Sequence, residues 1–440
     1  MSGELSDTSV LIQTRLTETA GLDANEDILG SPGRVRFQWS ADEAFADTEK
    51  TAWKNALPNA DYIVRFRLKN LSPGKRYYYR AEYGPTADDL RIGPTCSFKT
   101  LPGKSSDVVT HFVMTSCMNY NKFMYGKLGN AGPVITATEE DKRLGFPAFV
   151  AIKKLKPDFM IGSGDIVYYD NKINNAQRLS ELRQCWHEQF RFPRLIECFA
   201  DVPAYWSKDD HDFRYNDSDN SSARLPSRQT GIDVFREQLP ITETEDAGSP
   251  TYRTHRVNQG LQLWFTEGRD YRSDNRMPDG PDKTLWGAAQ IKWLKRTLRE
   301  SDAKFKIIVS PTPLVGPDMA KKSDNHTSLN GFRNEADAFF NWLKENELED
   351  LIVFCGDRHW QYFSIHPSGV REFACGAIND ENSRLGIAPG DPDGTDPDRL
   401  VQQQYISKEP TGGFLHVTAG DALMIEHRDD HGKVLHTEQF

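Results

Sequence analysis

The pattern of apolar and polar positions along this chain changes once, near residue 103. Before that point, five segments alternate in polarity or are rich in β-branched and aromatic residues: 10–16, 35–39, 62–68, 76–83 and 95–100. Such segments, separated by turns that contain proline and glycine, are typical of strands. The pattern predicts an all-β domain over residues 1–104, and residues 101–106 have the composition of a linker.

Beyond the linker, apolar runs alternate with amphipathic stretches. Strands are expected at 111–115, 159–161, 202–206, 261–266, 305–309, 351–355 and 414–418, with a hairpin around 429–432. Helices are expected at 146–155, 177–198, 287–299 and 332–343. The alternation predicts a layered α/β domain over residues 105–440. In the first domain, Tyr77 follows a turn as the corner tyrosine of immunoglobulin-like sandwiches does, so we expect a sandwich there.

Four of the apolar runs are followed directly by polar segments, at 116–120, 164–168, 208–212 and 356–359. In open α/β sheets, sites form beyond the carboxyl ends of the strands. The four segments carry thiol, carboxylate, phenol and imidazole groups, all of which bind metal ions. The sequence therefore predicts a metal site assembled from four strand ends.

The first two segments favour a transition metal. Asp165, directly after a glycine, is suited to bridge two cations, as two-metal sites require; taken alone it is as easily a solvated turn residue. Tyr168 alone would be a core tyrosine, and Cys117 is equally ambiguous. Together, a thiolate, a carboxylate and a phenolate suggest iron(III) better than zinc.

The segment 208–212 is the most specific of the four. Three acids around one histidine are costly unless cations compensate them. Asp210 is expected to bind a second metal ion, His211 to protonate a leaving group, and Asp212 to orient it. Asn216 offers a neutral oxygen suited to calcium. The alternative is an acidic, solvent-exposed loop.

The remaining candidates lie in three places. Asp357 and His359 stand at alternate positions after a strand, so both are expected to face one metal pair, unless they form a structural hydrogen bond. Arg269 follows another strand and its guanidinium could bind phosphate oxygens, although a surface charge cluster explains it nearly as well. His326 either lines the pocket or belongs to a helix cap. The acidic loop 391–398 lacks the spacing of an EF-hand.

Composition narrows the function further. A formal net charge of −10 and a pI of about 5.6 argue against nucleic acid or anionic membrane as partners. No apolar run approaches the roughly 20 residues of a membrane span. The first residues lack the features of an export leader, so the chain is expected to be cytoplasmic or to have lost a leader. The six cysteines are too few for a disulfide scaffold; Cys185 and Cys198 are candidates for a pair, but buried thiols are the simpler interpretation.

Taken together and in order, these motifs resemble those of the PhoD-type alkaline phosphatases, a branch of the calcineurin-like metallophosphoesterases. The resemblance covers nearly the whole chain, and the helix at 286–294 also resembles a family signature. It implies a four-layer αββα catalytic domain that hydrolyses phosphomonoesters or phosphodiesters with Fe(III) and Ca²⁺. It further implies that iron is bound by Cys117, Asp165, Tyr168 and His359. Calcium would be bound by Asp165, Asp210, Asn216 and Asp357. His211 and Arg269 would act on the substrate, and Asp209 is an alternative to Asp210.

The expected function is therefore metal-dependent hydrolysis of a small phosphate ester. Mn or Zn could replace iron or calcium. The family's export leader implies a periplasmic or secreted location, as the alternative to a cytoplasmic one. A phospholipase or phosphodiesterase of the same superfamily would share every ligand. A calcium-dependent binding protein with a decayed site is the rival from another class. The chain is expected to be a monomer or a small homo-oligomer.

Overall fold

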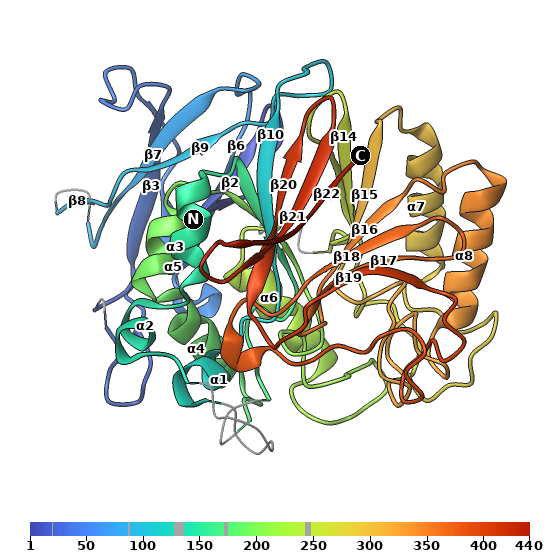
Figure 1. Cartoon of the computed structure of the whole chain (residues 1–440). Helices are drawn as coiled ribbons and strands as arrows, with labels where there is room; N and C mark the ends of the chain where they lie inside the picture. Colours follow the sequence, from blue (N-terminus) through green and yellow to red (C-terminus); the bar gives the residue numbers. More distant parts are fainter. Residues whose placement is uncertain (20, 87–88, 127–135, 171–174, 243–247) are drawn as a thin grey trace.

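The computed structural model describes residues 1–19, 21–86, 89–126, 136–170, 175–242 and 248–440, and three β-sheets form its frame (Figure 1). The largest is a nine-stranded sheet in the order β22 (Val434–Gln439), β21 (Leu423–Asp429), β20 (Gly413–Ala419), β10 (Thr110–Thr115), β11 (Phe159–Ser163), β12 (Ala204–Ser207), β1 (Ser2–Gly3), β2 (Val10–Arg15) and β6 (Ile63–Leu68). Its central strands β10, β11 and β12 are parallel, and their carboxyl ends therefore lie at one edge.

The second sheet has seven strands in the order β13 (Arg253–Arg256), β14 (Leu261–Phe265), β15 (Phe305–Ser310), β16 (Ile352–Cys355), β18 (Arg371–Cys375), β17 (Gln361–Ile365) and β19 (Gln402–Ile406). Strands β14, β15 and β16 are parallel. The two sheets share one apolar core, in which Phe112 of β10 lies 6.3 Å from Phe354 of β16 between ring centroids. The four predicted ligand-bearing strands thus belong to two sheets, with β16 in the second.

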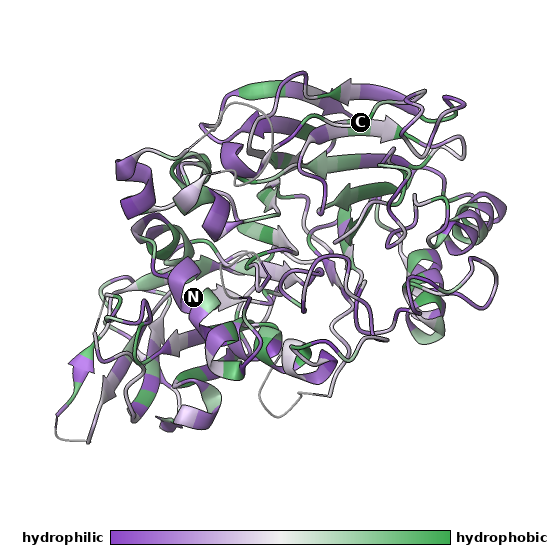
Figure 2. Ribbon diagram, turned by 90° about the horizontal axis from the view of Figure 1, so that it is seen from below, coloured by the Kyte–Doolittle hydropathy of each residue, from purple (hydrophilic) through white to green (hydrophobic). Residues whose placement is uncertain are grey.

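Helices cover the outer faces of the two sheets (Figure 1). On the nine-stranded sheet these are α1 (Tyr120–Tyr125), α2 (Glu139–Leu144), α3 (Ala148–Leu155), α4 (Leu179–Phe190), α5 (Pro193–Phe199) and α6 (Arg228–Gln238). On the seven-stranded sheet they are α7 (Ala288–Glu300) and α8 (Arg333–Glu345). Their apolar positions pack inward, as Leu294 and Leu298 of α7 do. The layers therefore run helix, sheet, sheet, helix, and in Figure 2 polar stretches are prominent on the outer helices.

One predicted helix was wrong in its extent. Residues 177–198 were expected to form a single helix, but the structure has α4 and α5 with a break after Phe190. Pro193 is the first residue of α5, where its missing N–H leaves no helical hydrogen bond unmade. The same proline could not continue the preceding helix, because it has no N–H to donate.

The third sheet is formed by residues near the N-terminus. All five strands predicted before residue 104 are present, but two of them, β2 and β6, belong to the nine-stranded sheet. The third sheet comprises β4 (Glu49–Lys50), β3 (Gly33–Ser40), β7 (Arg76–Gly84) and β8 (Arg91–Ile92), with β5 (Lys54–Ala56) paired to β3 and β9 (Cys96–Lys99) to β7. Short 3₁₀ helices lie at Pro58–Ala60 and Asp380–Asn382. The first strand, β1, instead pairs in parallel with β12, and so the N-terminal residues extend the sheet that carries the candidate site.

Candidate metal centre and active site

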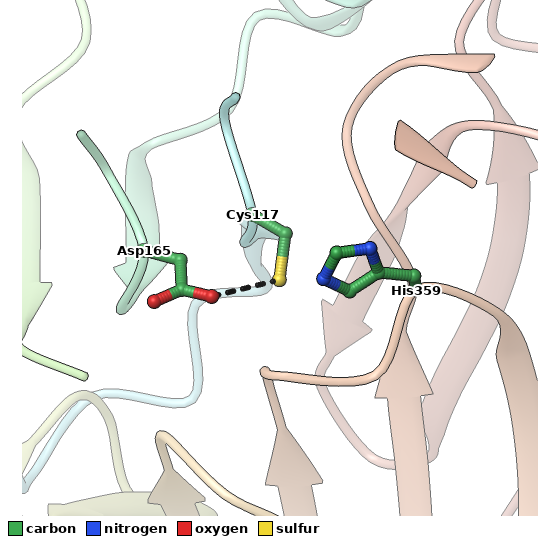
Figure 3. A group of neighbouring side chains, drawn as sticks. All are labelled: Cys117, Asp165 and His359. Atoms are coloured by element: carbon green, nitrogen blue, oxygen red, sulfur yellow. Dashed lines mark hydrogen bonds between the residues drawn. The ribbon is translucent and has the colours of Figure 1, made fainter. Parts of the chain in front are cut away.

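Three predicted ligands from three separate strands lie together in the interior. Cys117 follows β10, Asp165 follows β11 and His359 follows β16 (Figure 3). One ligand atom from each lies within 4.8 Å of the others, and all three residues are buried. The thiol of Cys117 donates a hydrogen bond to Asp165 Oδ2 across 3.4 Å. A sulfur, a carboxylate oxygen and an imidazole nitrogen therefore surround one point between the two sheets.

Tight backbone turns orient the side chains of the candidate ligands. Cys117, Asp165 and Asp357 have φ angles of 55°, 56° and 60°, which few residues other than glycine adopt. Such strained conformations persist only where the surrounding structure enforces them, and they concentrate at functional sites. A Cβ on Gly356 would lie 2.3 Å from the carbonyl oxygen of Ser163, so the turn after β16 approaches the end of β11 without room for a side chain.

The imidazole of His359 is held in the form that binds metals. Its Nδ1 donates to the backbone carbonyl of Asn382 across 2.7 Å, which leaves Nε2 as an acceptor. Figure 3 shows one ring nitrogen facing the sulfur of Cys117 and the other directed away. Burial, followed by the positive charges of Arg384 and Lys122, holds the pKa of His359 well below its usual value. The ring is therefore neutral at physiological pH.

Tyr168 and Cys117 both need a nearby cation to ionise. The phenol of Tyr168 donates to Asp165 Oδ2 across 3.2 Å. Burial, and then the charge of Asp165, raises the pKa of Tyr168 and that of Cys117 well above their usual values. Binding of a metal ion at this point would therefore release protons.

Further carboxylates extend the cluster from Asp165. Asp165 belongs to three of the four close groups of potential ligands: one with Cys117 and His359, one with Asp209 and Asp357, and one with Asp210 and His211. Such a shared position is what a bridging ligand needs. Asp209 and Asp210 both lie close to Asp165, so the structure leaves both candidates for the second ion. The fourth group joins Asp210 to Asp217 and Asp324.

Arg269 lies inside this acidic cluster and is fully buried. Its Nη2 lies 2.6 Å from Asp209 Oδ1 and 3.4 Å from Asp324 Oδ2, and its Nη1 donates to the carbonyl of Ser218 across 3.0 Å. Burial opposes its charge, but Asp209 and its other acidic neighbours raise the pKa of Arg269 well above its usual value. The guanidinium thus neutralises carboxylates that would otherwise repel one another, and its predicted contact with substrate stays a prediction.

His211 is paired with an aspartate that the sequence interpretation did not single out. The Nδ1 atom of His211 lies 2.6 Å from Asp170 Oδ1, and its ring stacks on Tyr168 with centroids 4.1 Å apart. Asp212 was expected to orient His211, but its carboxylate accepts the backbone N–H groups of Ile166 and Asp209. Asp170 stands only two residues after Tyr168, and that spacing was the available signal.

Two of the predicted site residues have their own local contacts. Asn216 is exposed, and its backbone N–H donates to Asp170 Oδ2 across 2.7 Å, beside the His211 pair. His326 is buried against Trp286, and its Nε2 lies 2.9 Å from Glu335 Oε1. A metal role for Asn216 and a substrate role for His326 stay predictions.

Arg358 forms ion pairs beside the cluster. Its guanidinium bridges Asp318 and the candidate ligand Asp357. Asp318 is in turn hydrogen-bonded by the side-chain amide of Asn325 across 2.8 Å. The bridge fixes the orientation of Asp357 from the side of the seven-stranded sheet.

All six cysteines are free thiols, so Cys185 and Cys198 are not paired.

Within the described ranges, no helix combines the length and the apolar character that crossing a bilayer requires. Sequence models of two domains match the chain: "PhoD-like phosphatase" over residues 112–415 and "PhoD-like phosphatase, N-terminal domain" over residues 1–102. Alkaline phosphatase D of Bacillus subtilis (strain 168) is 22% identical to the chain over 382 residues, which cover 75% of this chain and 59% of that protein. The chain thus spans less than two thirds of the length of this relative.

Two solved structures share the fold. One described as the structure of PhoD superposes with a TM-score of 0.74 and 18% identity, covering 99% of this chain and 87% of the other. The purple acid phosphatase PPD1 from yellow lupin (Lupinus luteus) seeds superposes with a TM-score of 0.65 and 14% identity, covering 99% and 72%. At these identities the likeness concerns the fold, whereas the family match covers most of the sequence. The chain belongs to the PhoD-like phosphatase family.

Proposed function

We propose that this protein is a metal-dependent phosphoric ester hydrolase that acts on small phosphomonoesters, phosphodiesters or both. The observation that carries the proposal is the buried meeting point of Cys117, Asp165 and His359, whose ligand atoms lie within 4.8 Å of one another. Burial of such groups is costly without a compensating cation. Membership of the PhoD-like phosphatase family and the name of the Bacillus subtilis relative support the same activity.

The donor set fits two kinds of ion. We assign Fe(III) to Cys117, Asp165, Tyr168 and His359, because thiolate, phenolate and imidazole suit a transition metal. We assign Ca²⁺ to Asp165, Asp210, Asn216 and Asp357, because calcium takes oxygen ligands. The buried Oδ2 of Asp209 and Oδ1 of Asp210 have no hydrogen-bond partner, as ligand oxygens reserved for a cation would. Mn or Zn are the alternatives at either position.

Residues of the chain are assigned separate roles in the proposed hydrolysis. When bound, such cations neutralise phosphoryl oxygens and activate a water or hydroxide for attack on phosphorus. Asp170 fixes Nδ1 of His211 and leaves Nε2 for the leaving group. Burial opposes protonation of this ring, but Asp210 and Asp170 outweigh it and raise the pKa of His211 well above its usual value. His211 is proposed to supply the proton that a departing alkoxide needs. Arg269 and His326 are proposed to contact the phosphate, Arg269 through the N–H groups of its guanidinium.

We also propose the finer organisation of the protein. Residues 1–104 are assigned to a sandwich of the immunoglobulin or fibronectin-III kind, and residues 105–440 to the four-layer αββα catalytic domain. The hydrogen bond from the Ser72 N–H to the Tyr77 hydroxyl, 2.9 Å long, supports a corner tyrosine. A monomeric or small homo-oligomeric state and a periplasmic or secreted location complete the proposal.

The experiment compares purified wild-type protein with Asp165→Ala and with the control Asp302→Ala. Asp302 is a matched carboxylate whose side chain is 91% exposed. Wild type and the control should release nitrophenol from 4-nitrophenyl phosphate or its bis-ester and should contain metal. Asp165→Ala should lose both turnover and metal. Full metal content and activity in Asp165→Ala would refute the assignment.

The same assay separates the rivals. A phosphodiesterase or phospholipase would favour the bis-ester over the monoester, whereas an alkaline phosphatase would favour the monoester. A calcium-dependent binding protein with a decayed site would bind calcium and hydrolyse neither compound. The transition-metal donors Cys117 and His359, which a pure calcium site does not need, favour an enzyme over that alternative.

A further inference from the structure

A second group of residues surrounds the candidate metal ligands on the side of His359, and Asn382 is its centre. The carbonyl of Asn382 accepts from His359 Nδ1, while its side-chain amide donates to the carbonyl of Cys117 across 2.9 Å and to the hydroxyl of Tyr168 across 3.3 Å. One residue thus contacts three candidate iron ligands. Whatever else Asn382 holds is therefore placed at the rim of the same site.

Asn382 also holds a cation. The ammonium group of Lys122, on α1, donates to Asn382 Oδ1 across 2.9 Å. A positive charge is thus fixed one side chain away from the thiol, the phenol and the imidazole.

Arg384 supplies a second cation from the same segment. Its backbone N–H donates to the carbonyl of His359 across 2.9 Å, and its guanidinium lies over the ring of Trp360, 5.3 Å from the centroid. The Nε atom of Arg384 is buried and has no hydrogen-bond partner. Leaving a buried donor unpaired is costly, so this N–H lacks an acceptor that a ligand could supply.

The other buried arginines of the site are already committed. Arg269 contacts Asp209 and Asp324, and Arg358 bridges Asp318 and Asp357. In the described parts of the chain, Arg384 takes part in no such ion pair. Of these three guanidinium groups, Arg384 is therefore the one that no carboxylate neutralises.

We propose that Arg384 and Lys122 bind the non-bridging phosphoryl oxygens of the substrate and select a phosphomonoester dianion over a phosphodiester monoanion. The inference rests on the proposed hydrolase activity and deepens it, since it names the substrate class. Above about pH 7 a monoester carries two negative charges, because its second pKa is about 6, whereas a diester carries one. Two cations at the rim therefore stabilise the bound monoester more strongly.

The test measures kcat/KM for 4-nitrophenyl phosphate and for bis(4-nitrophenyl) phosphate in four proteins. These are the wild type, Arg384→Gln, Lys122→Gln and the control Arg299→Gln, which removes an exposed arginine on α7. Each site variant should lose about tenfold in kcat/KM on the monoester, as the loss of one charge-assisted hydrogen bond predicts. The diester should change by less than about threefold, and the control should leave both rates unchanged.

A second readout does not depend on turnover. Inorganic phosphate, as a competitive inhibitor or in calorimetry, should bind both site variants about tenfold more weakly, with metal content equal to that of the wild type. Arg384→Lys should restore part of the phosphate affinity, because it keeps the charge and loses the Nε donor. An equal loss on both esters, or unchanged phosphate affinity at wild-type metal content, overturns the inference. A wild type that hydrolyses neither ester overturns the proposed function instead.

Discussion

A buried histidine outside the candidate site gives a sharp test of the electrostatics of this fold. His187, on α4, has Nδ1 2.6 Å from Asp27 Oδ1 and Nε2 2.7 Å from Asp61 Oδ2. Because carboxylates only accept hydrogen bonds, both ring nitrogens must carry protons for both contacts to form. The contacts join α4 to the loop between β2 and β3 and to the turn between the 3₁₀ helix Pro58–Ala60 and β6. His187→Gln removes the charge and one of the two hydrogen bonds.

The pH dependence follows from the direction of the shifts. Burial opposes the charged ring, but the hydrogen bonds that it donates to Asp27 and Asp61 raise the pKa of His187 above its usual value. A raised pKa in the folded state gives stabilisation that is complete below the unfolded pKa of about 6.5. It is lost as the pH rises through the folded pKa. Burial opposes ionisation of Asp61 as well, but its partners, His187 first, lower the pKa of Asp61 to about 2, so it stays charged throughout.

The size of the stability loss depends on the partners that Asp27 and Asp61 retain in His187→Gln. Asp27 has a side chain that is 28% exposed, so water screens its share of the interaction. Asp61 is buried, but it retains Arg15 at 2.9 Å and the amide of Gln238 at 2.8 Å after the substitution. The substitution therefore removes the equivalent of one charge-assisted hydrogen bond. We expect His187→Gln to lower the free energy of unfolding by about 2 kcal/mol near pH 6.

The assay is urea unfolding of wild type, His187→Gln and the control His431→Gln at several pH values. His431 has a side chain that is 75% exposed. The difference between wild type and His187→Gln should be largest near pH 6 and should shrink as the pH rises toward about 9. A difference that is constant with pH, or that grows as the pH rises, would show that His187 is neutral in the folded protein and would refute the reasoning.

Two further predictions concern the site. Gly356→Ala should lower the free energy of unfolding by about 1–3 kcal/mol and reduce activity, because its Cβ would meet a carbonyl oxygen of β11 at 2.3 Å. The matched change Gly280→Ala, with nothing within 4 Å of the new atom, should leave the free energy of unfolding nearly unchanged in the same urea unfolding assay. Equal effects of the two substitutions would contradict the crowding argument. Asp170→Asn should lower kcat by about tenfold to a hundredfold at unchanged metal content, because His211 loses the carboxylate that orients it and holds its proton. An unaltered kcat in that variant would remove Asp170 from the catalytic proposal.

The apolar runs predicted the strands well, because each buried parallel strand leaves a continuous hydrophobic signal. The residues after those runs, Cys117, Asp165 and His359, could therefore be assigned to strand ends from the sequence alone. The signal says nothing about which sheet a strand joins, and the position of β16 in the second sheet emerged only from the packing. The N-terminal strand β1 has two residues, too few for any periodicity.

Residues that act through others were harder to predict. Asp170 and Asn382 owe their positions to loops whose path depends on tertiary contacts, and neither stands in a motif. Asp212 was chosen for its place beside His211 in the sequence, yet neighbouring side chains in a turn point in different directions. Arg269 was predicted from its place after a strand and from its guanidinium, and the sequence could not reveal that three carboxylates surround it.

The central claim is that Cys117, Asp165, Tyr168 and His359 share a metal ion. X-ray diffraction from crystals of the purified protein, collected above and below the iron absorption edge, tests it most directly. The account predicts an anomalous peak within bonding distance of Cys117 Sγ and of His359 Nε2, and its loss in Asp165→Ala. An anomalous peak elsewhere in the protein, or a metal retained at full occupancy without the Asp165 carboxylate, would contradict the claim.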